Sequence, residues 1–265
     1  MPELMDLGFY LLVGGIAGLL AGLLGIGGGL IIVPALIWLY LANGVDPSVV
    51  VHLAVGTSLA TIIITSISSI RAHHKRGAVR WHLVVRLAPG IVLGAWLGAV
   101  IADMLQTWWL QRVFACFVIL VGVQMALGAK TEAHRDLPGL PGMSVAGGLI
   151  GMISAIVGIG GGSMTVPFLN WCSVNMREAV ATSAACGLPI ALAGTLGFIV
   201  AGWSESALPA GSTGYIYWPA FLGIVASSYL FAPLGAKLAH SLPLPALKRV
   251  FAVLLFVVGG KMLLG

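Results

Sequence analysis

The chain has 265 residues, of which 59% are hydrophobic and 8% are charged, and its mean hydropathy is +1.07. Soluble domains carry about 25% charged residues, so this composition excludes a soluble fold and indicates a polytopic membrane protein. The formal net charge is +5. Because the basic residues lie in short loops beside apolar segments, we interpret them as topological anchors and expect no nucleic-acid partner.

The apolar sequence falls into segments, of which the first and fifth are too long to be single spans. As one helix, residues 7–42 would be about 54 Å long, against a hydrocarbon core of about 30 Å. Glycine runs interrupt both long segments, at Gly25–Gly29 and at Gly158–Gly162. Each glycine costs about 1 kcal/mol in a helix interior, so we predict a broken helix hairpin at each run. The arms of the second hairpin are short, and both a spanning and a re-entrant form fit its length. The segments are 7–42, 50–70, 82–102, 108–128, 143–171, 179–202, 215–236 and 246–264.

The two halves of the chain resemble one another beyond the glycine runs. The run Val55–Ser58 matches Val180–Ser183, and Leu110–Ala115 matches Leu247–Ala252 in the same order. We therefore predict an internal repeat, divided into a first membrane repeat (1–129), a cytoplasmic linker (130–141) and a second membrane repeat (142–265).

Loop charges predict how the repeats are oriented. The basic loop Arg71–Arg86 should be cytoplasmic, whereas its counterpart, Gly202–Gly214, holds Glu205 and no lysine or arginine. This opposite bias predicts an all-α fold of two inverted repeats, each a Gly-broken helix hairpin plus three transmembrane helices. Both termini then lie outside. The alternative is eight simple helices in parallel repeats.

The glycine runs are the best candidates for a binding site. In an inverted pair they can meet near the membrane midplane, where unpaired N–H groups at the start of each following helix attract an anion. The matched Thr-Ser pairs supply hydroxyl donors. Alternatively, the glycines only permit close helix packing and the hydroxyls bond back to their own helices. The candidate substrate-binding residues are Gly27, Gly28, Gly29, Thr57, Ser58, Gly160, Gly161, Gly162, Thr182 and Ser183, with Pro34 and Pro167 supporting the helix breaks.

Nothing in the sequence indicates an enzyme, a cofactor or a metal site. Nucleophile-elbow, metalloprotease and phosphate-loop motifs are missing from the sequence, and the three cysteines are isolated. His52 and Glu205 are either interfacial residues or part of a proton-linked step. We interpret His73, His74 and His82 as a solvated cluster in the basic loop.

The run Gly22–Gly29 with Val33-Pro34, its second copy from Val157 to Pro167, and Gly56-Thr57-Ser58 resemble the sulfite exporter TauE/SafE family. The resemblance implies a multi-pass permease of the prokaryotic inner membrane that handles sulfite or organosulfonates, and it adds Pro34 and Pro167 to the motif. Ala181 departs from the pattern, standing where the first repeat has Gly56. The expected activity is secondary transport of a small sulfur-containing anion, in the export direction, by alternating access. A passive anion channel and a non-transporting membrane partner protein are the alternatives.

Overall fold

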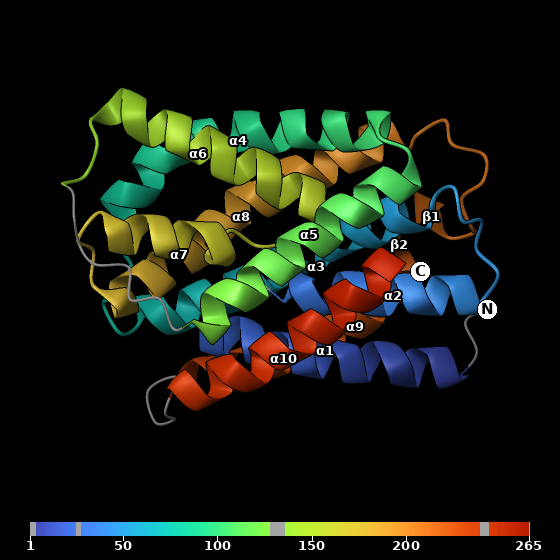
Figure 1. Cartoon of the computed structure of the whole chain (residues 1–265), viewed down its shortest axis with the longest axis horizontal. Coiled ribbons are helices and arrows are strands. Elements are labelled where there is room, and N and C mark those ends of the chain that lie inside the picture. Colours follow the sequence, from blue (N-terminus) through green and yellow to red (C-terminus); the bar gives the residue numbers. More distant parts are fainter. Residues whose placement is uncertain (1–3, 25–27, 128–135, 239–243, 265) are drawn as a thin grey trace.

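The structure is a computed structural model that describes residues 4–24, 28–127, 136–238 and 244–264 (Figure 1). The described residues form ten helices and one small antiparallel hairpin, β1 (Ser212–Thr213) with β2 (Ile216–Tyr217). The helices are α1 (Leu4–Leu24), α2 (Gly29–Ala42), α3 (Val50–His74), α4 (Trp81–Met104), α5 (Thr107–Ala126), α6 (Leu140–Val157), α7 (Gly162–Trp171), α8 (Met176–Ala201), α9 (Trp218–Leu238) and α10 (Leu244–Leu264).

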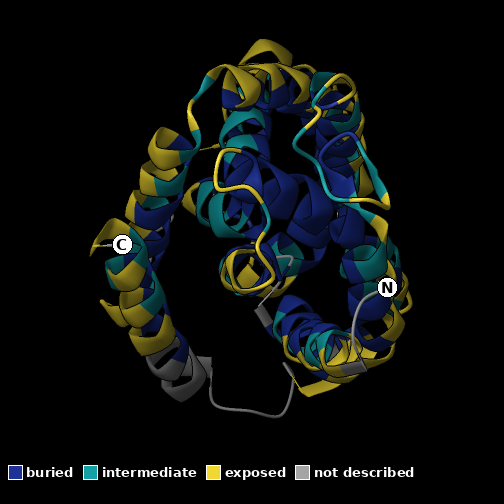
Figure 2. Cartoon of the chain, turned by 90° about the vertical axis from the view of Figure 1, so that its right-hand side faces the viewer, coloured by how far each residue is buried: buried dark blue, intermediate teal, exposed yellow. Residues whose placement is uncertain are grey.

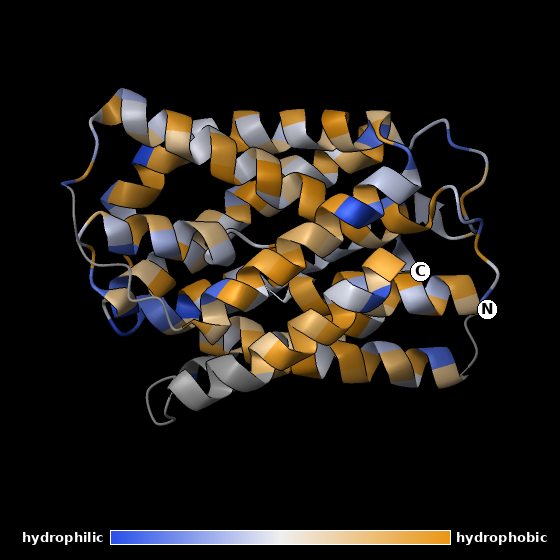
Figure 3. Ribbon diagram, viewed as in Figure 1, coloured by the Kyte–Doolittle hydropathy of each residue, from blue (hydrophilic) through white to orange (hydrophobic). Residues whose placement is uncertain are grey.

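Within the described residues, seven helices are long and apolar enough to cross a membrane by length and composition: α1, α3, α4, α5, α6, α8 and α9. Apolar residues fill the middle of the molecule and polar residues gather in the loops at its two ends (Figure 3). The predicted polytopic all-α membrane fold is confirmed.

Both long apolar segments break where the glycines predict. The first becomes α1 and α2, and the second becomes α6 and α7. In each case the last glycine of the run, Gly29 or Gly162, is the first residue of the new helix. The basic loop is shorter than Arg71–Arg86, because α3 continues to His74 and α4 already begins at Trp81.

Helices α3 and α8 form the centre of the molecule. Their most apolar windows are 83% and 61% buried, against 33–44% for the other five candidate spans. Seen end on, buried helices are enclosed by helices whose outward faces are exposed (Figure 2). On α4, for example, the outward side chains Val85, Leu93 and Leu97 are exposed hydrophobic residues. Such a surface suits lipid, whereas soluble proteins rarely expose large apolar patches.

The peripheral helices pair across the two halves of the sequence. Helix α1 packs along α9, and α4 packs along α6. Glycines set the spacing of both pairs: a Cβ on Gly94 of α4 would lie 2.0 Å from the carbonyl oxygen of Gly148, and one on Gly18 of α1 would lie 2.6 Å from that of Ser228. Small residues allow membrane helices to approach this closely, and dispersion contacts then hold them together. The two halves are therefore interlocked.

Corresponding helices run in opposite directions. In Figure 1 the chain enters α3 at the right-hand end of the molecule and α8 at the left-hand end. Helices α4 and α9 also start at opposite ends, α4 at the left and α9 at the right. These directions support the inverted relation of the repeats, which stays a prediction.

The α4–α6 seam gives a test of this packing. Substituting Gly94→Ala should lower the stability of the detergent-purified protein by about 2 kcal/mol or more, because the methyl group overlaps a backbone oxygen that cannot move aside. A Cβ at Gly8 of α1 meets no atom within 4 Å, so Gly8→Ala is the matched control and should leave the stability unchanged or slightly raised. Thermal unfolding of both variants measures the difference, and equal midpoints would contradict the seam.

Candidate functional site

The two glycine breaks touch one another inside the protein. Gly28 precedes α2 with φ 75° and Gly158 ends α6 with φ 73°, a left-handed conformation that favours glycine. A Cβ on Gly29 would lie 2.2 Å from the carbonyl oxygen of Gly158, and the Ser58 hydroxyl donates a 2.8 Å hydrogen bond to that same oxygen. The structure thus joins Gly29 and Ser58 to the second break, whereas Gly28 lies against Ala17 of α1. Gly27 lies outside the described residues.

The second break borders a small polar cavity at the start of α7. Its walls include the predicted residues Gly160, Gly161 and Ser183, together with Thr65, Ser66 and Ser69 of α3. The space holds about one water molecule, which is less than an oxyanion needs. No charged side chain contributes to these walls.

Sequence reasoning missed the three α3 hydroxyls of the cavity, Thr65, Ser66 and Ser69. All three are buried. The available signal was the closely spaced Thr65-Ser66 and Ser68-Ser69 pairs inside an apolar segment, since buried hydroxyls within a membrane need a partner or a ligand.

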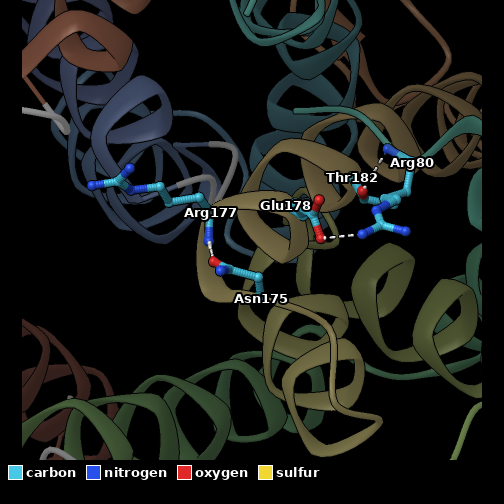
Figure 4. Close-up of polar contacts among 5 residues, drawn as sticks. All are labelled: Arg80, Asn175, Arg177, Glu178 and Thr182. Atoms are coloured by element: carbon cyan, nitrogen blue, oxygen red, sulfur yellow. Dashed lines mark hydrogen bonds and ion pairs between the residues drawn. The ribbon is translucent and has the colours of Figure 1, made fainter. Parts of the chain in front are cut away.

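The two predicted threonines hold the halves together away from the contact between the breaks. The Thr57 hydroxyl accepts a 3.0 Å hydrogen bond from the Tyr217 N–H, just before α9. The Thr182 hydroxyl accepts a 3.1 Å bond from the Arg80 N–H, just before α4 (Figure 4). Each threonine therefore satisfies an unpaired N–H at the start of a helix of the other half. Each hydroxyl keeps its proton to donate, and a role of either threonine in substrate binding stays a prediction.

Polar contacts at the loop end of α8 hold helix ends in place. Arg80 forms an ion pair with Glu178 at 2.8 Å, with half of the Arg80 side chain exposed. Asn175 caps α8 by accepting from the Arg177 N–H, while the Arg177 side chain points away from this ion pair (Figure 4). An exposed ion pair of this kind contributes at most about 1 kcal/mol.

His52 does not behave as an interfacial side chain. It is buried, and its Nε2 lies 2.9 Å from the carbonyl oxygen of Ala102 and 3.1 Å from that of Leu105, at the end of α4. The ring therefore caps α4. Beside it, the Tyr215 hydroxyl donates to Asp103 at 3.2 Å. Burial, together with the negative charge of Asp103, raises the pKa of Tyr215 above its usual range.

The prediction that His73 belongs to a solvated histidine cluster is wrong. This side chain is only 4% exposed, because it lies on the last turn of α3, which the sequence assigned to the loop. His74 accepts a hydrogen bond from the Trp81 indole, and His82 is exposed at the start of α4.

Comparison with known proteins decides the family. The profile of the family described as "Sulfite exporter TauE/SafE" matches residues 10–262. The chain belongs to the sulfite exporter TauE/SafE family. It is a multi-pass membrane protein, and its membership confirms the expectation drawn from the glycine runs.

Three curated relatives of this TauE/SafE protein are similar over nearly their full length. A "probable membrane transporter protein" of Haemophilus influenzae is 44% identical over 96% of this chain and 97% of its own. Proteins of the same description from Methanocaldococcus jannaschii and Bacillus subtilis are 29% and 26% identical, each over 98% of this chain and at least 97% of their own. No solved structure matches the chain.

Thr182 gives a second test, in which one partly buried hydrogen bond is compared with one partly exposed ion pair. Thr182→Val leaves the Arg80 N–H without its acceptor and should cost about 1–3 kcal/mol. Glu178→Gln removes the ion pair and should cost about 1 kcal/mol or less. Thermal unfolding of the two variants, with Thr182→Ser as a control that keeps the acceptor, checks the order. A larger loss for Glu178→Gln would contradict this assignment.

Proposed function

We propose that this TauE/SafE protein is a secondary transporter of a small sulfur-containing anion, sulfite or an organosulfonate, and that it works in the export direction. The observation that carries the proposal is the contact between the two glycine breaks, with the start of α7 facing a buried polar cavity. Membership of the family and the printed description of its relatives as transporters support the same activity.

The site suits an anion because of its backbone. The first N–H groups of a helix have no intrahelical partner and carry about half a positive charge from the helix dipole. At α7 these groups follow Gly160 and Gly161, so no side chain blocks an approaching oxyanion. Ser66 and Ser69 of α3 add hydroxyl groups to the walls. The Ser183 and Thr65 hydroxyls instead donate to carbonyl oxygens of their own helices, those of Val180 and Ile62. Without a buried lysine or arginine, binding stays weak enough for release on the other side.

Because the cavity holds only about one water molecule, the protein must move to load its substrate. Because α1 packs on α9 and α4 on α6, the moving bodies differ from the two halves of the sequence. We propose that each cross-half pair moves as a unit against the central helices α3 and α8, which exposes the breaks to one side of the membrane at a time.

Sulfite counterflow into proteoliposomes tests this function. The wild type should show saturable counterflow, whereas a passive channel would conduct without counterflow, and a non-transporting partner protein would give no flux. Gly161→Val should reduce the initial rate about tenfold or more, since its Cβ would lie 2.7 Å from Ile190 and 2.9 Å from the Thr165 hydroxyl and its branches would fill the cavity. Gly8→Ala is the control in open surroundings and should transport normally.

A further inference from the structure

We infer that the two glycine breaks are unequal and that the anion is held at the second one, between the start of α7 and the hydroxyl groups Ser66 and Ser69 of α3. The inference rests on the proposed transport function and assigns its specificity-determining side chains. It replaces the expectation that both glycine runs contribute equally to one anion site.

The side chains that follow each break differ in polarity. Ser163 and Thr165 lie in the first turn of α7, whereas the same positions of α2 hold Leu30 and Ile32. At the first break, Gly29 already lies against the Gly158 carbonyl, so neighbouring backbone fills its surroundings. The first break therefore closes the centre of the molecule, and the second faces the cavity.

The central helices show the same inequality. Counting equally from the matched Thr-Ser pairs, Ser66 of α3 corresponds to Ala191 of α8, and Ser69 corresponds to Gly194. A Cβ on Gly187 of α8 would lie 3.0 Å from the Ser66 hydroxyl oxygen, which places this hydroxyl at the α3–α8 contact beside the cavity. The central-helix donors therefore come from α3, because α8 contributes small residues and Ser183, whose hydroxyl donates to the Val180 carbonyl.

Unpartnered hydroxyls gather around the start of α7. Ser69 is only 4% exposed and lines the cavity, yet its Oγ has no hydrogen-bond partner within the described part of the chain. The Oγ of Ser163 and the Oγ1 of the buried Thr165 also have no hydrogen-bond partner among the described residues, although neither residue lines the cavity. The Thr165 hydroxyl oxygen would lie 2.9 Å from a Cβ on Gly161. Buried hydroxyls without partners are costly. Their concentration at one helix start, next to a polar cavity, points to a ligand that accepts hydrogen bonds.

The donor set defines the chemistry of that ligand. Hydroxyl groups of α3 and backbone N–H groups at the start of α7 meet at this cavity, whose lining includes no carboxylate and no ammonium group. This arrangement suits a compact pyramidal or tetrahedral oxyanion, whose several oxygens can accept from different directions. The lining lacks the carboxylate groups that protein sites for Ca²⁺ and Mg²⁺ commonly use.

The test compares serines on one helix. Ser69→Ala and the double variant Ser66→Ala with Ser69→Ala are set against Ser68→Ala, whose hydroxyl instead donates to the Tyr229 carbonyl at 3.3 Å. We expect the KM for sulfite in counterflow to rise about tenfold for Ser69→Ala, the usual effect of losing one hydrogen bond to a charged group, and further for the double variant. Ser68→Ala should keep the wild-type KM.

Thermal unfolding without ligand separates binding from folding. Ser69→Ala removes a hydroxyl that has no partner, so its midpoint should equal or exceed that of the wild type even though its KM rises. A loss of folding on this substitution, or an unchanged KM in Ser69→Ala beside a transporting wild type, would overturn the inference and leave the proposed function intact. A folded wild type without saturable flux of sulfite or sulfonates would overturn both.

Discussion

Backbone that leaves the helical path inside a membrane must find its hydrogen-bond partners within the protein. Here the two breaks pack against one another, and Ser58 of α3 supplies a partner. The Gly158 carbonyl, at the end of α6, lies against Gly29 at the start of α2 and accepts the Ser58 hydroxyl. Any side chain at Gly29 would separate these segments. This one contact fixes where the two hairpins end, and it positions the start of α7 beside the central helices.

Further contacts between the two halves hold the surrounding helices in place. Thr57 and Thr182 each accept the N–H at the start of a helix of the other half, and His52 caps the end of α4. Because α1 packs on α9 and α4 packs on α6, the two halves cannot separate without breaking these helix–helix contacts. The transport cycle that we propose therefore places the motion between the cross-half pairs and the central helices. In that proposal the contact between the breaks separates and re-forms during each cycle.

The sequence predicts features that follow from local chemistry. Three glycines in an apolar run cost too much to remain helical, so the breaks and the starts of α2 and α7 were predictable. The orientation of each helix about its own axis was not predictable. Helix α3 is buried on nearly all sides, so its apolar pattern does not reveal which side Ser66 and Ser69 face. The role of Thr182 was hidden for a related reason, since its partner Arg80 is distant in sequence and is contacted through its backbone.

The inequality of the breaks changes how the repeat is understood. The predicted repeat has two similar helix starts whose side chains differ, because Leu30 and Ile32 follow the first break and Ser163 and Thr165 follow the second. In the site that we propose, the repeat provides the scaffold and the departures from repeat symmetry provide the binding groups.

The most direct test of this account is a structure of the protein with selenite, a pyramidal oxyanion whose selenium is located by anomalous scattering. The account predicts one selenium peak at the start of α7. The anion's oxygens should then lie within hydrogen-bonding distance of the Ser69 hydroxyl and the Gly161 backbone N–H. A peak at the start of α2, or at a site away from both breaks, would contradict it.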